Sequence, residues 1–76
     1  MTRHRVCIGR DVSAVSEHAD GIELEGQTRL RPGDEILIVR PSSGDAPLVR
    51  TAMVWSWYVR RLGSDGPTYR GICRWT

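Results

Sequence analysis

Lysine and phenylalanine are absent from this sequence of 76 residues, and cysteine, methionine and tryptophan each occur only two or three times. The 11 basic residues are therefore all arginine, and with 9 acidic residues they give a formal net charge of +2. Such an excess is far smaller than the dense basic surface of a dedicated DNA-binding domain. Net charge therefore identifies no partner, although the planar guanidinium group suits phosphates and base edges.

Long apolar runs are also missing. No segment approaches the roughly 18 apolar residues of a membrane span, and no apolar stretch follows the charged N-terminus as it would in a secretory signal. We therefore expect a cytoplasmic protein that is not inserted into a membrane. The two cysteines, Cys7 and Cys73, are too few for a disulfide framework, so we expect reduced thiols.

The short length limits the kinds of site that the chain can form. We expect one domain over residues 1–76, which buries only roughly 60 to 65 per cent of its unfolded surface. A functional site should then be a surface groove or an interface. An enzyme is disfavoured because a nucleophile, a base and an orienting group need an enclosure. The spacing of the two histidines and two cysteines fits no familiar zinc site, so no metal or other cofactor is expected.

Alternation of apolar and polar residues dominates the chain, and no segment keeps a helical period for ten residues. Turn-forming pairs such as Asp20-Gly21 and Pro32-Gly33 separate the alternating segments. Strands are predicted near residues 5–14, 21–26, 34–40, 48–61 and 67–75. We predict an all-β fold, a small antiparallel β-barrel of five to six strands, because closure removes exposed sheet edges.

The longest predicted strand carries most of the aromatic residues. Its odd positions include Trp55 and Trp57 and are assigned to the core, which makes packing the expected role of both side chains. Tyr58 and Trp75 are the candidates for exposed aromatics. The residues expected to be buried are Ile36, Ile38, Trp55, Ile72 and either Val54 or Met53.

Three parts of the sequence together resemble the PilZ domain, a small β-barrel of bacterial signalling proteins. They are GRDVS at residues 9–13 leading to GIEL at 21–24, LRPGDEI at 30–36, and AMVW at 52–55 with the closing YRGI at 69–72. Their order matches the family along most of the chain. The resemblance implies a PilZ-like barrel and makes cyclic di-GMP a candidate ligand.

The ligand motifs of that family are only partly present. PilZ domains that bind cyclic di-GMP carry an RxxxR motif before the barrel and a [D/N]xSxxG motif at the first hairpin. Asp11 and Ser13 match the second motif, but Ser16 stands where glycine belongs, and the N-terminal arginines lack the RxxxR spacing. Arginine forks and a carboxylate are nevertheless the groups that recognise guanine edges and phosphates. The resemblance thus gives the candidate ligand-binding residues Arg3, Arg5, Arg10, Asp11 and Ser13.

The sequence suggests two alternative functions of different classes. The first is a PilZ-like signalling domain, either a cyclic di-GMP receptor or a degenerate, non-binding adaptor that acts through a partner protein or a second copy of the chain. The alternative is an SH3-like or OB-like barrel that binds RNA or single-stranded DNA. Binding of that kind would depend steeply on salt. The arginines assigned to it are Arg50, Arg60, Arg61, Arg70 and Arg74.

Overall fold

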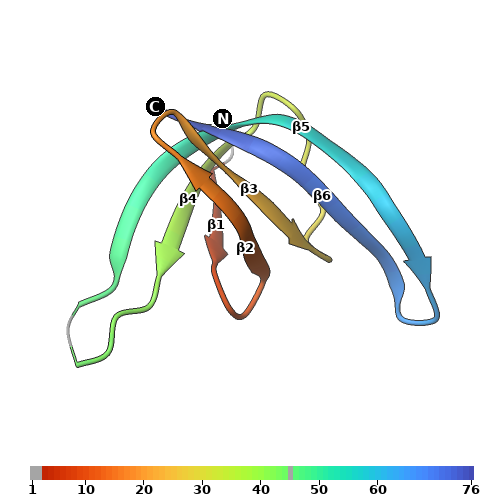
Figure 1. Cartoon of the computed structure of the whole chain (residues 1–76), viewed down its shortest axis with the longest axis horizontal. Helices are drawn as coiled ribbons and strands as arrows, with labels where there is room; N and C mark the ends of the chain where they lie inside the picture. Colours follow the sequence, from red (N-terminus) through yellow and green to blue (C-terminus); the bar gives the residue numbers. More distant parts are fainter. Residues whose placement is uncertain (1–2, 45) are drawn as a thin grey trace.

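The structure is a computed structural model that describes residues 3–44 and 46–76, with Arg3 described by its backbone alone. Among these residues it contains strands and no helix, which confirms the predicted all-β class (Figure 1). The six strands are β1 (Arg3–Cys7), β2 (Val12–His18), β3 (Gly21–Gly26), β4 (Glu35–Arg40), β5 (Leu48–Gly63) and β6 (Gly66–Trp75).

All six strands belong to one mixed sheet with the order β1-β4-β5-β6-β3-β2. The short N-terminal strand β1 runs parallel to β4, and every other neighbouring pair is antiparallel. The long strands β5 and β6 curve over the other four as an arch, and their connecting hairpin extends past the end of β3 (Figure 1). One face of this curved sheet, the inner face, carries the core, and we call the opposite face the outer face.

The sheet curls but does not close into the barrel that the sequence predicted. Between its end strands β1 and β2 the described residues form one isolated bridge, which joins Ile8, just after β1, to Val12. Beside this bridge the side chain of Asp11 contacts the end of β1, where its Oδ2 accepts the N–H of Cys7 at 2.8 Å. The N–H of Asp11 in turn donates to the carbonyl of Cys7 at 2.8 Å. The end of β1 therefore bonds to the connecting turn instead of to β2.

The prediction of the first strand was wrong because the same turn interrupts it. Residues 5–14 were predicted as one strand, whereas the structure has β1 and β2 with a break between Cys7 and Val12. Gly9 lies in the break with φ of 98°, a left-handed backbone conformation that interrupts an extended strand. The other four predicted strands coincide with β3 to β6 to within two residues at each end.

The core contains ten buried residues, all of them on strands except Leu30 in the β3–β4 connection, and Ile8, Trp57 and Trp75 also pack against them. Burial is as predicted for Ile36, Ile38 and Val54. The prediction was wrong for Trp55 and Ile72, which are 53% and 44% exposed. The core residues are Val6, Val12, Ile22, Leu24, Leu30, Ile36, Ile38, Ala52, Val54 and Cys73.

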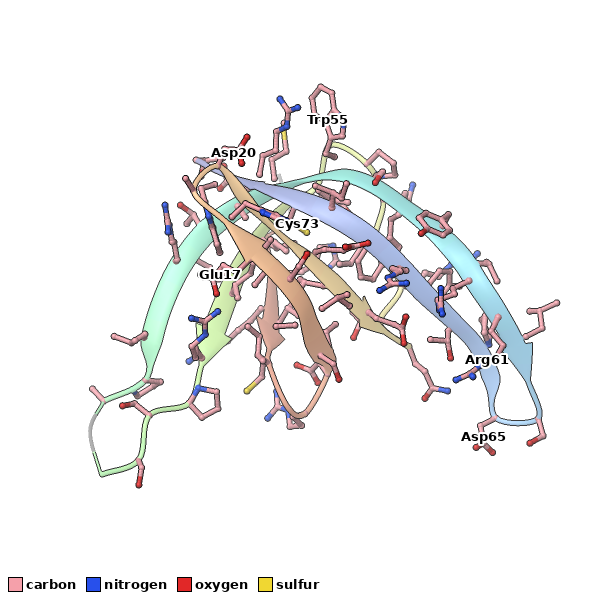
Figure 2. The ribbon with its side chains drawn as sticks, in the orientation of Figure 1. Glu17, Asp20, Trp55, Arg61, Asp65 and Cys73 are labelled. Carbon is pink, nitrogen blue, oxygen red and sulfur yellow. The ribbon has the colours of Figure 1, made fainter. Side chains whose placement is uncertain are left out.

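A β-bulge in β5 is the reason for the error at Trp55. Val54 lies opposite Cys73 and Ser56 lies opposite Ile72, so Trp55 is an extra residue without a partner on β6. The bulge reverses the alternation of faces along the strand. Val54 therefore faces the core before the bulge, and Trp57 faces it afterwards. Trp55 points away from the core at the top of the arch, on the side opposite Cys73 (Figure 2).

The error at Ile72 has another cause: β6 alternates without a break here, with Gly71 and Cys73 buried, so Ile72 shares the outer face with Arg70 and Arg74.

Within the described residues no helix is long and apolar enough to cross a membrane.

Candidate functional site

The turn between β1 and β2 forms one wall of a shallow surface groove of about 450 Å³. Arg10, Asp11 and Ser13, three of the five predicted site residues, line this groove together. Glu25 and the residues that follow β3 form the other wall, because Ser13 pairs with Glu25 in the β2–β3 ladder. We call this the turn groove.

The two remaining predicted residues do not line the turn groove. Arg5 lies on β1 opposite Leu37, and its exposed side chain belongs to the outer face because the neighbouring Val6 is in the core. Arg3 pairs through its backbone with Glu35, and its side chain lies outside the described part of the structure. The structure therefore brings together the three predicted residues that follow Gly9 and separates them from Arg3 and Arg5.

Arg10 and Asp11 bind one another across the turn. The Nε of Arg10 lies 3.3 Å from Oδ1 of Asp11, and its Nη2 lies 3.4 Å from Oδ2. The hydrogen bond from the backbone N–H of Cys7, followed by the one from Arg10, lowers the pKa of the Asp11 carboxyl. The same contact with Asp11 raises the pKa of the Arg10 guanidinium. The Arg10 guanidinium and the Asp11 carboxylate, two of the predicted ligand-binding groups, therefore already bind each other within the turn.

The charges of the turn groove do not suit a dianionic ligand. Arg10 is the one cation among the lining residues, which also include the carboxylates of Asp11 and Glu25. Cyclic di-GMP carries two phosphate charges and needs free guanidinium groups to bind them. The groove instead offers one arginine that is already paired and two carboxylates that would repel phosphate.

Two of the arginines that we assigned to nucleic-acid binding are also paired with carboxylates. On the outer face, Nε of Arg70 lies 3.2 Å from Oε2 of Glu23 and 3.7 Å from Oε1 of Glu25. Nε of Arg60 lies 3.1 Å from the same Oε1 of Glu25. These ion pairs link β3, β5 and β6, and they reduce the positive charge that this face presents to solvent.

Two further arginines stack on tryptophan rings, on opposite faces of the sheet. The guanidinium carbon of Arg50 lies 4.0 Å from the ring centre of Trp75 on the inner face. That of Arg74 lies 4.1 Å from the ring centre of Trp55 on the outer face. Arg50 therefore lies apart from Arg74, Arg60 and Arg70, which are on the outer face. Trp75 is half-buried, and its Nε1 donates to the carbonyl of His18 at 3.2 Å.

An exposed patch of large side chains lies on the outer face around the bulge of β5. Trp55, Ile72, Arg74 and Tyr58 make up this outer patch, and Tyr58 is 52% exposed, as the sequence predicted. The ladder joins them, because Ser56 next to Trp55 pairs with Ile72, and Tyr58 pairs with Arg70 two residues away. Figure 2 shows Trp55 projecting from the top of the arch. Sequence reasoning missed Trp55 because no residue pattern announces the bulge, and it missed Ile72 although the alternation of β6 places this residue on the face of Arg70 and Arg74.

A second cavity of about 270 Å³ lies on the inner face near the end of β4. Its walls include Glu17 of β2, Arg40 of β4, and Leu48 and Arg50 of β5, with Trp75 of β6. The Nη2 of Arg40 donates to Oε1 of Glu17 at 2.6 Å. This contact joins β2 to β4 by side chains, where the sheet provides no backbone pairing between them.

The cysteines and histidines do not form a reactive centre. Cys7 and Cys73 are both free thiols, and burial raises the pKa of Cys73 to about 11, which keeps it protonated at neutral pH. Among the described residues no three histidine, cysteine, aspartate or glutamate side chains are grouped so that they could hold a metal ion.

Comparisons with known proteins add no assignment, since no family model, no curated protein and no solved structure matches the chain.

Proposed function

We propose that the chain is a PilZ-like signalling domain of the degenerate kind, a non-enzymatic cytoplasmic adaptor of bacteria that acts by binding a partner protein. The observation that carries this proposal is the outer patch, where Trp55 and Tyr58 are exposed beside Ile72 and Arg74. Tryptophan, tyrosine and arginine are the residues most enriched among the hot spots of protein interfaces. Such side chains on a rigid sheet lose little conformational entropy when a partner covers them.

The turn groove favours the adaptor over the receptor. Asp11 and Ser13 preserve part of the family motif, but the guanidinium of Arg10 is held by Asp11, and Glu25 adds a second carboxylate. A receptor for a dianionic nucleotide would have to release Arg10 from Asp11, and the arginines nearest to Glu25, Arg60 and Arg70, are already paired with that carboxylate. The groove therefore offers no free guanidinium group to phosphate.

The arrangement of arginines disfavours the nucleic-acid alternative. Binding of RNA or single-stranded DNA needs a positive groove that follows the phosphate backbone beside exposed aromatic rings. Arg60 and Arg70 are paired with glutamates, and Arg50 lies on the face opposite Arg74. The stacked pair of Arg74 and Trp55 can anchor a protein partner. A polynucleotide needs a series of such contacts along its backbone, and among the described residues this pair stands alone on the outer face.

A heteronuclear NMR titration distinguishes the three functions. We expect no amide shifts with cyclic di-GMP or with GMP, and at most weak, salt-sensitive shifts with a short RNA. Saturable shifts of the Arg10, Asp11 and Ser13 amides with cyclic di-GMP, and not with GMP or RNA, would contradict the adaptor function and show that the chain is a cyclic di-GMP receptor. Tight RNA binding that is lost over a moderate rise in salt would establish the nucleic-acid function instead.

The partner itself can be sought by cross-linking from the outer patch. A photoreactive residue at Ile72 should link the chain to a discrete protein in cells, and Trp55→Ala should abolish the product. A photoreactive residue at Val15, which is also exposed but lies on β2, serves as the matched control and should give no such product. Equal products from both positions would contradict a role for the outer patch.

A further inference from the structure

The cavity near the end of β4, which we call the inner cavity, lies between β2 and the β4–β5 pair. Its volume of about 270 Å³ is just below the roughly 300 to 1,000 Å³ of typical small-molecule sites. Glu17 forms its wall on β2, and Figure 2 shows this residue on the side of β2 that faces β4. The strands β2 and β4 are not neighbours in the sheet. The curl of the sheet therefore leaves a site for a small ligand between them.

Arg50, which lines the inner cavity, is positioned by an aromatic ring and not by a carboxylate. Its guanidinium carbon lies 4.0 Å from the ring centre of Trp75, and the Nε1 of that ring is held by the carbonyl of His18. Among the described residues no carboxylate forms an ion pair with Arg50. Stacking uses the flat face of a guanidinium group and leaves the N–H groups along its edge available. Arg50 is therefore an ordered cation whose charge is not compensated.

The charges around the inner cavity match a ligand with one negative charge. Arg40 and Arg50 are the cations among the lining residues, and Glu17 is the carboxylate among them. The charges of Arg40 and Glu17 compensate one another, since Nη2 of Arg40 lies 2.6 Å from Oε1 of Glu17. Arg50 remains for the ligand, and a carboxylate fits a guanidinium group with two parallel hydrogen bonds. A phosphate dianion would keep one uncompensated charge close to Glu17.

The inner cavity also offers apolar surface beside this cation. Ile38 belongs to the core and also lines the cavity, so it forms the floor. Leu48 is 64% exposed on the wall. In the β4–β5 ladder Ile38 pairs with Arg50, and Leu48 pairs with Arg40, so apolar and basic side chains alternate on the same face. An aliphatic ligand body would cover Leu48 and be removed from water itself, which favours binding.

We propose that the inner cavity binds a small monocarboxylate with an aliphatic body. The carboxylate accepts hydrogen bonds from the guanidinium group of Arg50, and the body lies against Ile38 and Leu48. This site is on the inner face, whereas the proposed adaptor function uses the outer patch. The inference therefore goes beyond that function and does not depend on it.

A heteronuclear NMR titration of the full chain with octanoate, below its micelle concentration, tests the site. We expect saturable shifts of the Trp75 indole N–H and of the Ile38 and Leu48 amides, and none in the outer patch. Octanol has the same body without the charge and should bind at least about tenfold more weakly. Octylamine should cause no saturable shift, because Arg50 repels its ammonium group. Octanol binding as tight as octanoate binding, or octanoate shifts centred on the outer patch, would overturn the inference.

Two arginine variants test the role of Arg50. Arg50→Gln should raise the octanoate Kd about tenfold or more, because the charge-assisted hydrogen bonds are lost. Arg74→Gln is the matched control, since it removes the other arginine–tryptophan stack, on the outer face, and should leave the Kd unchanged. Equal Kd values for the two variants would overturn the inference.

A third variant is independent of any folding defect. Glu17→Gln removes the carboxylate of the inner cavity and leaves Arg40 as a second uncompensated cation, so it should lower the octanoate Kd. Loss of structure cannot tighten binding. A Kd that stays unchanged or rises in Glu17→Gln would overturn the inference. Trp55→Ala should leave octanoate binding intact, so failure of this proposal and failure of the outer patch give different results.

Discussion

The guanidinium of Arg40 donates to the carboxylate of Glu17 at 2.6 Å and so connects β4 to β2. Both side chains are 43% exposed, which means that solvent screens the pair. Exposed ion pairs contribute at most about 1 kcal/mol, and often less. The contact therefore holds the curvature of the sheet weakly, and the apolar core must provide most of it.

A double-mutant cycle on this pair measures that contribution. Glu17→Ala and Arg40→Ala should each lower the free energy of unfolding by less than about 1 kcal/mol. The coupling energy should be positive but small in urea denaturation, and it should decline in high salt. A coupling above about 2 kcal/mol would show that the pair is the main clamp between the strands.

Because of the bulge in β5, alanine substitution of two neighbouring tryptophans should change the free energy of unfolding by different amounts. Trp57→Ala should lower the free energy of unfolding by about 3 kcal/mol, because Trp57 packs on the core and its Nε1 donates to the carbonyl of Thr28. Trp55→Ala should change it by less than about 1 kcal/mol, since that side chain is 53% exposed and lies outside the core. Thermal or urea unfolding of both variants is the measurement, and equal losses would refute the bulge.

Close backbone contact makes Gly71 sensitive to a single methyl group. A Cβ at this position would collide with the carbonyl of Ser56 and with the Trp57 ring. Gly71→Ala should therefore lower the free energy of unfolding by about 1 to 3 kcal/mol. Gly63→Ala is the control, because its nearest neighbour would be the carbonyl of Gly66 at 3.7 Å. If both variants unfold at the wild-type urea concentration, β5 and β6 are less closely spaced than described.

The ionised form of Asp11 should make stability depend on pH in the acid range. Its pKa lies below the ordinary value of 3.8, so the folded state favours the carboxylate more than the unfolded chain does. The resulting stabilisation is present above the unfolded pKa and is lost as the pH falls through the folded pKa. Asp11→Asn should be less stable than wild type near neutral pH and should lose less stability on acidification. Parallel stability curves for the two proteins in urea at several pH values would exclude this role.

The alternation of residues predicted most of the strands because burial on one face imposes a period of two. In β3 the sequence Ile22-Glu23-Leu24-Glu25 shows this directly, with both aliphatic residues in the core. The same logic failed at Trp55, since one unpaired residue reverses the faces without changing composition. It also failed at Gly9, where a glycine between alternating residues reads equally well as part of a strand or as a break.

The candidate site was less predictable than the fold because it depends on contacts between distant strands. Arg10, Asp11 and Ser13 are close in sequence, so their shared groove follows from proximity. The presence of Glu25 in that groove depends on β2–β3 register, and the pairing of Arg70 with Glu23 depends on β3–β6 register. The outer patch further depends on the bulge. The residue types around each position do not reveal the strand register or the bulge, so these relationships could not be predicted from the sequence.

The order of the strands also has a consequence for how the chain reaches this structure. The β2–β3 and β5–β6 hairpins join residues near in sequence, but the ladder between β3 and β6 pairs Gly21 with Arg74 from opposite ends of the chain. Because such a ladder requires closure of a very long loop, its formation should limit the folding rate. The last strand must be synthesised before the first hairpin can acquire its neighbour, so an incomplete chain leaves β3 with an unpaired edge.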